Sequence, residues 1–260
     1  LSEVWPTLHD PTMIEEIEAR WRECVRGEQA GEMLVSLKGA DARYRPFLTR
    51  AEPVRSANGR IRCWLGTMTE IGEQREAEQN QRFLVELGDA LRDKSDPAEI
   101  LVITGRMLGT HLDVLRVGYG EVGPDENEVF AGARGWQAND ERRLPAAVQL
   151  DIFGSGLAGQ LRRGEVSIVS DTLSDAAVGD CAANHLRFDI RASITVPLVK
   201  SGRLAAFLYA HAATARAWRN SEVQLVRDVA ERTWATLERA RAETARRTSE
   251  DRLRQSEAQL

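Results

Sequence analysis

The C-terminal stretch from Asn220 to Leu260 contains neither glycine nor proline. Because these two residues are the usual breakers of a helix, the stretch predicts one long continuous helix. In its last part only Leu253 and Leu260 are strongly apolar, so its heptads are weaker than those of an extended coiled coil. We expect it to pair with a second copy in a homodimer, because earlier positions approximate a 3-4 spacing: Val223, Val226, Ala230, Thr233, Leu237 and Ala240.

The N-terminal third predicts one helix followed by a small antiparallel sheet. Apolar residues recur at helical spacing over residues 11–26, and Gly27 is expected to cap that helix. The dipeptide Asn58-Gly59 favours a type I′ hairpin, since both of its residues must take positive φ. The strands of the expected meander cover residues 32–38, 44–54 and 61–69, with the other turn at Gly39-Ala40-Asp41. Because such a meander leaves one face uncovered, we expect the first half of this domain to be missing.

The rest of the chain predicts a larger domain that begins after a connecting helix. Residues 72–92 are polar at first and then carry an apolar stripe. Asp96 marks a new helix start as its N-cap, with Pro97 at the first position and Glu99 placed for a capping box. A second short helix over residues 156–163 is expected to be capped by Ser155.

Strands in this larger domain are expected at residues 114–122, 128–135, 166–169, 190–200 and 203–211, with a polar loop at 170–184. The last two strands form a hairpin around Ser201-Gly202. The chain as a whole therefore predicts an α+β fold. A partial antiparallel sheet precedes a domain with a mainly antiparallel sheet and flanking helices, and long helices join and follow the two.

Composition excludes several classes of function. The 35 basic and 40 acidic residues are interleaved and give a formal charge of -5, so no basic face for nucleic acid or an anionic membrane is expected. No apolar run approaches the roughly 20 residues of a membrane helix, and no signal peptide is seen, which predicts a cytoplasmic location. The cysteines Cys24, Cys63 and Cys181 are far apart and contain no CxxC, so neither a disulfide framework nor a metal site is predicted.

Two stretches in the first third resemble a known sensory family. The runs WPTLHDPTMIEEIEARW and RYRPFLTRAEPVRSANGRIRCWLGTMTEIGEQREAE are similar to the C-terminal half of a PAS domain and its trailing helix. That family usually has Asp-Ile after the last strand, where this chain has Glu70-Ile71. The resemblance implies the later part of a PAS sheet.

A second resemblance covers residues 83–243, through RRGEVSIVSDTLSD, IRASITVPLVKSGRLAAFLYAHAATARAWRNSEVQLVRDVAERTW and LERARAE. These runs look like a GAF domain, and they are most similar to GAF domains of proteobacterial multi-sensor histidine kinases, often of the HWE type. The resemblance implies an input role upstream of a kinase. No histidine lies on a predicted dimerisation helix and no phosphate-binding loop appears, so autophosphorylation is not assigned to this chain.

The domain boundaries expected on this basis are the C-terminal part of a PAS domain at residues 1–75, a connecting helix at 76–95, a GAF domain at 83–243 and a helical or coiled-coil linker at 244–260. We expect a non-catalytic sensory input module of a two-component signalling protein. It would relay the state of an unknown small ligand or partner through dimeric helices to a downstream kinase or other effector. The alternatives are a bilin-binding photoreceptor and a ligand-free structural or dimerisation spacer.

Cys181 and His185 are the candidate residues for the bilin alternative. They share the loop in which cyanobacteriochrome GAF domains attach a bilin through cysteine and stack a histidine near its pyrroles. A thiolate can add to a bilin side chain, and an imidazole can hydrogen-bond the ring carbonyls. Those families usually place the histidine directly after the cysteine, whereas here Ala182 follows Cys181, so an inert loop cysteine is the competing interpretation.

Two other GAF activities fit the sequence poorly. The cyclic-nucleotide signature Asn-Lys…Phe…Asp-Glu is approached by Asn184, Phe188 and Asp189, but the lysine and the glutamate are lacking. A methionine sulfoxide reductase of this fold needs a resolving thiol near the attacking one, and Cys181 is the only cysteine of the region.

Arg191 is the remaining candidate, because it is a charged residue in an otherwise apolar strand. A buried guanidinium needs an anion, and Asp171 or Asp175 is expected to supply it. An ion pair within the fold and an anionic ligand are the two interpretations. His111 and His211 are expected to be structural imidazoles, and Trp136 and Trp218 either wall a pocket or cover the sheet.

Overall fold

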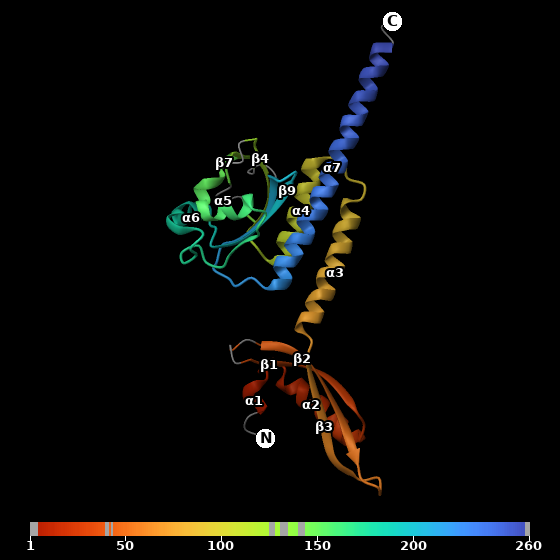
Figure 1. Ribbon diagram of the computed structural model, residues 1–260. Helices are drawn as coiled ribbons and strands as arrows, with labels where there is room; N and C mark the ends of the chain where they lie inside the picture. Colours follow the sequence, from red (N-terminus) through yellow and green to blue (C-terminus); the bar gives the residue numbers. More distant parts are fainter. Residues whose placement is uncertain are drawn as a thin grey trace. The chain divides into compact units, whose positions relative to one another are not determined.

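The computed structural model describes residues 5–39, 42, 44–124, 128–130, 135–139 and 144–257. The chain divides into two compact units, Leu1–Gln79 and Asn80–Leu260 (Figure 1). Every strand pairing that is defined in either unit is antiparallel, and helices accompany both sheets, which confirms the α+β class. Among the described residues no helix is long and apolar enough to cross a membrane.

The first unit contains α1 (Trp5–Leu8), α2 (Ile14–Gly27) and a sheet of order β1-β2-β3, whose strands span Gly31–Lys38, Tyr44–Arg55 and Ile61–Glu70. Helix α2 packs on the sheet through Ile17, which meets Met33 and Val35 in a small core. The predicted helix and meander are thus present. Gly27, however, is the last helical residue, and Glu28 takes the left-handed conformation (φ 51°) that closes α2.

The β2–β3 turn differs from the predicted type I′ hairpin. Gly59 has φ 81°, but Asn58 is not among the residues with positive φ. The amide of Gly59 donates to the carbonyl of Ser56 at 2.9 Å, and the amide of Ser56 donates to the carbonyl of Arg60 at 2.8 Å. The loop is therefore longer than two residues, and a single glycine in the left-handed region closes it. The other predicted turn includes residues 40 and 41, which lie outside the described part of the chain.

The sheet of the second unit has the order β7-β5-β4-β10-β9-β8, and β6 also pairs with β4. Its strands are β4 (Arg116–Val122), β5 (Glu128–Phe130), β6 (Gly135–Gln137), β7 (Ala147–Gln149), β8 (Ser167–Val169), β9 (Ala192–Lys200) and β10 (Arg203–Ala212). Ser201 and Gly202 both take positive φ (51° and 77°), as the predicted β9–β10 hairpin requires. The predicted strand at 128–135 is described at its two ends only, as β5 and the first residue of β6.

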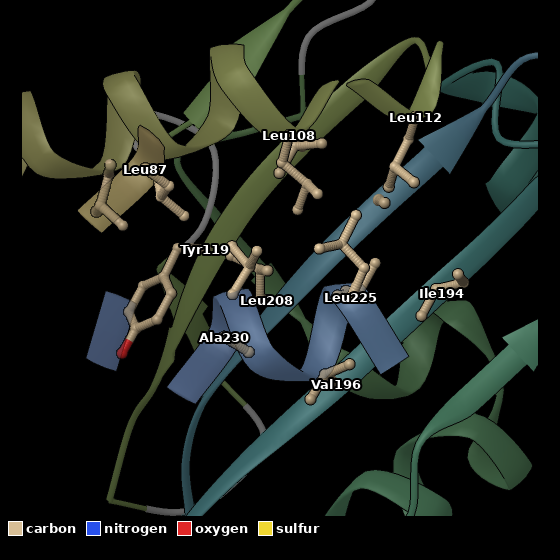
Figure 2. Close-up of a cluster of buried hydrophobic side chains, with 14 of the residues drawn as sticks. Leu87, Leu108, Leu112, Tyr119, Ile194, Val196, Leu208, Leu225 and Ala230 are labelled. Atoms are coloured by element: carbon tan, nitrogen blue, oxygen red, sulfur yellow. The ribbon is translucent and has the colours of Figure 1, made fainter. Parts of the chain in front are cut away.

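Three long helices lie on one side of this sheet (Figure 1). They are α3 (Gly72–Leu91, which belongs to this unit from Asn80 onward), α4 (Pro97–Leu112) and α7 (Asn220–Glu257). Alternate residues of β10 point toward them, and Leu208 packs with Leu108 and Leu225 in the main core (Figure 2). The helices and the sheet thus share one hydrophobic core.

Two predicted helix starts differ in detail. Asp96 caps α4 as expected, since its carboxylate accepts from the amide of Ala98 at 3.0 Å, but Glu99 pairs with Lys94 at 2.5 Å instead of completing a capping box. Ser155 is the first residue of α5 (Ser155–Arg162), and Gly154 precedes it with φ 119°. A side chain at Gly154 would come within 2.7 Å of the carbonyl oxygen of Ala177, so only glycine fits there.

The other face of the sheet carries α5, the short α6 (Ala182–Arg187) and two 3-10 turns, Leu150–Phe153 and Gly179–Cys181 (Figure 1). The 3-10 turn at 179–181 and the start of α6 lie in the stretch that sequence reasoning treated as a polar loop. On the helical face, α7 contributes buried residues to the core as far as Ala240, and residues 244–250 are exposed within the single chain. The last three residues of its predicted span, 258–260, lie outside the described part.

Candidate functional site

A cavity of about 40 Å³ lies between the second sheet and the elements on its α5 and α6 face. Most of its wall is apolar and comes from Val129, Leu144, Val148, Leu150, Phe153, Leu157, Leu161, Ile190 and Phe207. In the described part of the chain, the polar residues that line it are His185, Ser193, Thr195, Tyr209 and His211. An apolar pocket with a few convergent polar groups is the usual form of a small-molecule site.

Strand alternation explains how the polar residues meet. Tyr209 and His211 lie two residues apart on β10, so their side chains emerge on the same face of the sheet. In the β9–β10 register Tyr209 is opposite Thr195 and His211 is opposite Ser193, which makes two adjacent cross-strand pairs. These four residues form one polar corner at the end of an apolar cavity.

Two glycines of β4 make room for the aromatic residues of this face. Gly118 pairs with Tyr209 and Gly120 pairs with Phe207 across the β4–β10 ladder. A methyl group at Gly118 would lie 2.2 Å from the Tyr209 hydroxyl oxygen, and one at Gly120 would lie 2.6 Å from the Phe207 ring. The rings therefore lie flat over the glycines, and this packing fixes how far they project into the cavity.

Burial sets the protonation of the corner. The rings of Tyr209 and His211 are stacked with centroids 4.4 Å apart. Burial raises the pKa of Tyr209 to about 12. Burial, together with the positive charge of Arg116, holds the pKa of His211 well below its usual range. Burial also lowers the pKa of His185, whose Nδ1 lies 3.2 Å from the carbonyl oxygen of Cys181. All three groups are consequently neutral near neutral pH.

Arg116 lies next to this corner, opposite His211 in the β4–β10 ladder, and is 4% exposed. Its Nε donates to the Gln137 side-chain oxygen at 2.7 Å, and an Nη donates to the Phe188 carbonyl at 3.3 Å. Burial lowers the pKa of Arg116, and the charge of Asp189 opposes that effect. Arg116 is not among the residues that line the cavity.

The sequence-predicted pair Cys181 and His185 is only partly brought to the cavity. His185 lines it, is 2% exposed and meets the Phe153 ring edge to face at 5.2 Å. Cys181 is a half-buried free cysteine at the N-cap of α6, one turn earlier, and it is not among the lining residues. The hydrogen-bonding contact between the two residues is made by the backbone carbonyl of Cys181.

Arg191 and Asp171 form a bidentate ion pair at the end of the same loop, with Nε–Oδ1 at 2.7 Å and Nη–Oδ2 at 3.1 Å. Hydrogen bonding from Arg191 is the main reason that the pKa of Asp171 falls to about 2. The sequence predicted a buried guanidinium at Arg191. The Arg191 and Asp171 side chains are instead 33% and 29% exposed, so the ion pair is only partly buried. Asp175 has a different role, because it accepts from the amide of Ala177 at 2.8 Å.

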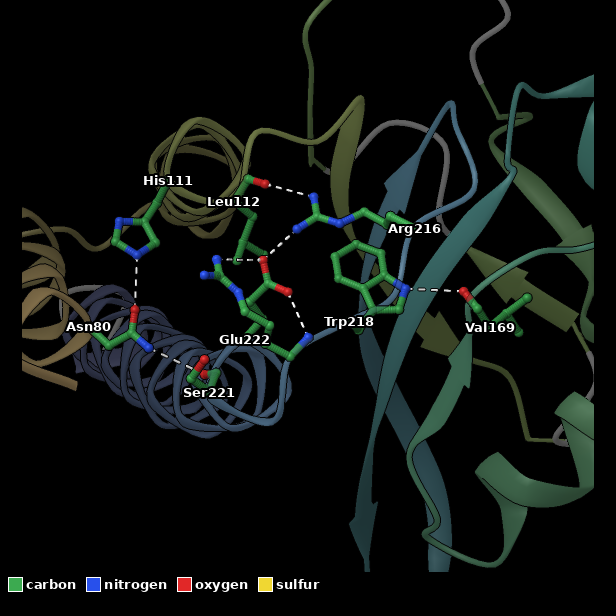
Figure 3. Close-up of polar contacts among 9 residues, drawn as sticks. Asn80, His111, Leu112, Val169, Arg216, Trp218, Ser221 and Glu222 are labelled. Carbon is green, nitrogen blue, oxygen red and sulfur yellow. Dashed lines mark hydrogen bonds and ion pairs between the residues drawn. The ribbon is translucent and has the colours of Figure 1, made fainter. Parts of the chain in front are cut away.

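A polar network joins the start of α7 to its neighbours (Figure 3). Arg216 stacks on Trp218 at 4.3 Å, donates to the Leu112 carbonyl at 3.0 Å and pairs with the carboxylate of Glu222. Glu222 is 5% exposed and also accepts from the amide of Arg219 at 2.9 Å. Trp218 donates from Nε1 to the carbonyl of Val169, at the end of β8, at 3.1 Å.

Asn80 extends this network to α3. Its amide group donates to the Ser221 carbonyl at 3.3 Å, and its oxygen lies 3.0 Å from Nε2 of His111 (Figure 3). Burial lowers the pKa of His111, against the charges of Glu86 and Glu222. We call Asn80, His111, Arg216, Trp218, Arg219, Ser221 and Glu222 the helix junction. It ties the first turn of α7 to α3, to the end of α4 and to β8.

The two candidate tryptophans lie away from the cavity wall. Trp218 belongs to the helix junction. Trp136, on β6, lies against α4, where a methyl group at Gly109 would be 2.1 Å from its ring. In the part of the chain that the structure describes, no group of three or more acidic, cysteine or histidine side chains is arranged to hold a metal ion.

Two parts of the chain match known sequence families. Residues 96–237, more than half of the chain, match the GAF domain family. The chain belongs to the GAF family. Residues 1–76 match the PAS fold family, so a PAS fold precedes the GAF domain. A comparison with curated proteins finds no match.

Solved structures share the GAF fold at low sequence identity. A free methionine-R-sulfoxide reductase from Neisseria meningitidis aligns over 65% of this chain and 93% of its own, at 17% identity and a TM-score of 0.53. The GAF domain of a phosphoenolpyruvate-protein phosphotransferase from Coxiella burnetii aligns over 65% and 98%, at 14% identity and a TM-score of 0.53. A phycoerythrobilin-bound GAF domain from a cyanobacterial phytochrome aligns over 64% and 97%, at 13% identity and a TM-score of 0.54. At these identities the likeness establishes the fold.

Sequence reasoning missed the polar corner. It treated His211 as structural and did not consider Ser193, Thr195 or Tyr209, and among the polar lining residues it singled out His185 alone. The signal was available in the hairpin, because Tyr209 and His211 are polar residues at alternate positions of an otherwise apolar strand. Their partners on β9 become visible only when the register is known.

Proposed function

We propose that this chain is the sensory input module of a bacterial two-component signalling protein, whose parent is a sensor histidine kinase of the HWE type. In this proposal the PAS part covers residues 1–75, a connecting helix 76–95, the GAF domain 83–243 and a helical linker 244–260. The chain acts as a cytoplasmic homodimer without catalysis of its own. The state of the GAF cavity is passed through α3 and α7 to a downstream kinase.

The helix junction is the observation that carries this proposal. It bonds the first turn of α7 to α3 through Asn80 and to the sheet through Trp218. Both helices also contribute to the core on the sheet face opposite the cavity. A shift in the sheet or in β8 therefore reaches both helices through direct contacts, as a relay needs.

A short path leads from the cavity to that junction. Ile190 lines the cavity, and its carbonyl accepts from the Thr172 hydroxyl at 3.2 Å. Thr172 lies two residues after Ser170, whose carbonyl accepts from the amide of Arg216 at 3.0 Å.

The segment between β8 and β9 contains the residues predicted from the sequence: His185, Cys181 and the Arg191–Asp171 pair. We assign them as ligand-responsive residues. A ligand switches the output only if it binds two helix arrangements with different affinity, and a difference of a few kcal/mol suffices.

Self-association through the end of α7 tests the dimeric relay. A chain that ends at Thr244 keeps every residue of α7 that is buried in the core, because the last of these is Ala240. Sedimentation equilibrium of the full chain is expected to give a dimer. The dimer of the shortened chain is expected to be weaker, so that it dissociates at a higher protein concentration. Monomers for both chains over the whole concentration range would refute the proposal.

A bilin photoreceptor is the second candidate, on the observation that a free cysteine lies one helical turn from a cavity histidine. The cavity of about 40 Å³ argues against it, because drug-sized ligands occupy roughly 300–1,000 Å³. Co-expression with bilin-synthesis enzymes is expected to give a colourless protein. A reversible absorption band that disappears in Cys181→Ala would establish the photoreceptor instead.

A ligand-free spacer is the third interpretation, and the small size of the cavity favours it over the bilin. It differs from the relay in one measurable respect. A spacer dimerises in the same way but binds no small molecule, so binding to the cavity separates the two.

A further inference from the structure

We propose that the GAF cavity binds a compact, uncharged molecule of about three to five non-hydrogen atoms, apolar over most of its surface and carrying one hydrogen-bonding group that faces the Tyr209–His211 corner. The inference deepens the proposed sensory function and rests on it for its biological role. The binding itself can be measured independently of any relay.

The size follows from the cavity volume. One water molecule needs about 10–15 Å³ measured in the same way, so a cavity of about 40 Å³ has room for roughly three of them. Nine of its described lining residues are apolar, so most of the surface of an occupant meets hydrocarbon. A bilin or a nucleotide is too large for this space, whereas a short amide, alcohol or ketone fits it.

The polar end of the cavity offers at least one unused hydrogen-bonding atom. His211 is 8% exposed, and its Nδ1 is buried without a hydrogen-bond partner in the described part of the chain. An unpaired buried polar atom destabilises the fold, and a ligand that bonds to it recovers that loss. Ser193, Thr195 and Tyr209 line the same corner of the cavity.

The charge of the ligand follows from what the cavity can compensate. Among the described residues that line the cavity there is no lysine, arginine, aspartate or glutamate. Burial keeps His185, His211 and Tyr209 in their neutral forms, because it lowers the pKa of both histidines and raises that of the phenol. The guanidinium of Arg116, which lies opposite His211 in the β4–β10 ladder, donates to Gln137 and to the Phe188 carbonyl, and the charge of Asp189 acts on it. An ionised ligand would therefore be buried without a counter-charge, which is strongly unfavourable.

The test compares propionamide with propionate, which have the same number of non-hydrogen atoms and differ in charge at neutral pH. The full chain has four histidines, so the ring signals of His9, His111, His185 and His211 can be followed separately by NMR. Propionamide is expected to shift the His185 and His211 signals along a saturable curve and to leave the other two unchanged. Propionate is expected to bind at least about tenfold more weakly, because its charge must be desolvated.

Two matched variants locate the binding. Val148 lines the cavity and is half-buried on the edge strand β7, so Val148→Phe fills part of the space with little strain and is expected to abolish the shifts. Val199, on β9, is 46% exposed and outside the cavity wall, so Val199→Phe is expected to bind as the unaltered chain does. Thermal unfolding of both variants checks that they fold.

Each other result overturns the inference. Propionate binding as tightly as propionamide means that the cavity takes anions. Shifts that survive in Val148→Phe mean that the probe binds elsewhere. No saturable shift with either probe means that the cavity does not take this class of ligand, while the dimeric relay is still decided by the association of the full and shortened chains.

Discussion

Glu222 is the acidic residue of the helix junction and is buried, so its replacement gives a sharp prediction. The side chain is 7% exposed and pairs with Arg216, which is 24% exposed. It also accepts from the amide of Arg219 at 2.9 Å and from the Arg219 guanidinium at 3.3 Å. Glu222→Gln keeps an oxygen for the amide of Arg219 but removes the charge that faces both guanidinium groups.

The expected loss can be worked out from these contacts. A hydrogen bond between charged groups contributes about 1.5–3 kcal/mol when partly buried, and this value applies to the Arg216 pair. The Arg219 guanidinium is 59% exposed, and exposed pairs contribute about 0–1 kcal/mol. We therefore expect Glu222→Gln to lower the free energy of unfolding of the GAF unit by about 2 kcal/mol, which corresponds to a roughly 30-fold change in an equilibrium constant.

Glu250→Gln is the matched control, because it makes the same chemical change on the exposed part of α7. Glu250 pairs with Arg246 at 2.5 Å, but the two side chains are 47% and 59% exposed. An exposed pair four residues apart on a helix contributes about 0.3–0.5 kcal/mol. The measurement is hydrogen exchange of peptides that cover the first two turns of α7, combined with thermal unfolding. Equal effects of the two variants on exchange and on the unfolding temperature would refute the assigned role of the junction.

Three further predictions follow from the GAF unit. Gly118→Ala is expected to destabilise it by about 1–3 kcal/mol in urea unfolding, because the new methyl group overlaps the Tyr209 hydroxyl. Gly88→Ala is the control: it lies on an open helix surface and is expected to stabilise the unit by about 0.5–1 kcal/mol. Asp171 has a depressed pKa of about 2, so the ionised carboxylate stabilises the GAF unit above about pH 4, and this stabilisation is lost as the pH falls toward 2. Asp171→Asn is expected to reduce the decrease of the urea unfolding midpoint at acidic pH, and an unchanged decrease would contradict this. Burial depresses the pKa of His211 in the folded protein, so His211 takes up a proton on unfolding below about pH 6.5. The free energy of unfolding therefore decreases as the pH falls below this value, and His211→Gln is expected to reduce the slope of that free energy against pH.

Local features of the sequence were sufficient for most of the secondary structure. The Asp96-Pro97 start of α4 and the Ser201-Gly202 hairpin are present because they depend on capping and on positive φ, which a few adjacent residues decide. The predicted type of the turn at Asn58-Gly59 was wrong for a related reason. Ser56 and Arg60 can also bond across the loop, and the longer closure is the one that formed.

The helix α6 was missed because its sequence gives little local signal. It spans only Ala182–Arg187 and has no side-chain cap. Tertiary contacts hold it instead: His185 packs against Phe153, and Asn184 donates to the Ile152 carbonyl at 2.7 Å. A helix this short does not form from propensity alone, so packing decides whether it exists.

The sequence by itself determined the α+β class, the PAS and GAF families, and the long helix α7, because periodicity, turn residues and family motifs are local properties of a chain. Only the tertiary structure decided which residues meet. The β9–β10 register brings Ser193 and Thr195 beside His211 and Tyr209, and Asp171, not Asp175, reaches Arg191. Contacts between residues far apart in the chain depend on register and on close packing, and neither leaves a periodic trace in the sequence.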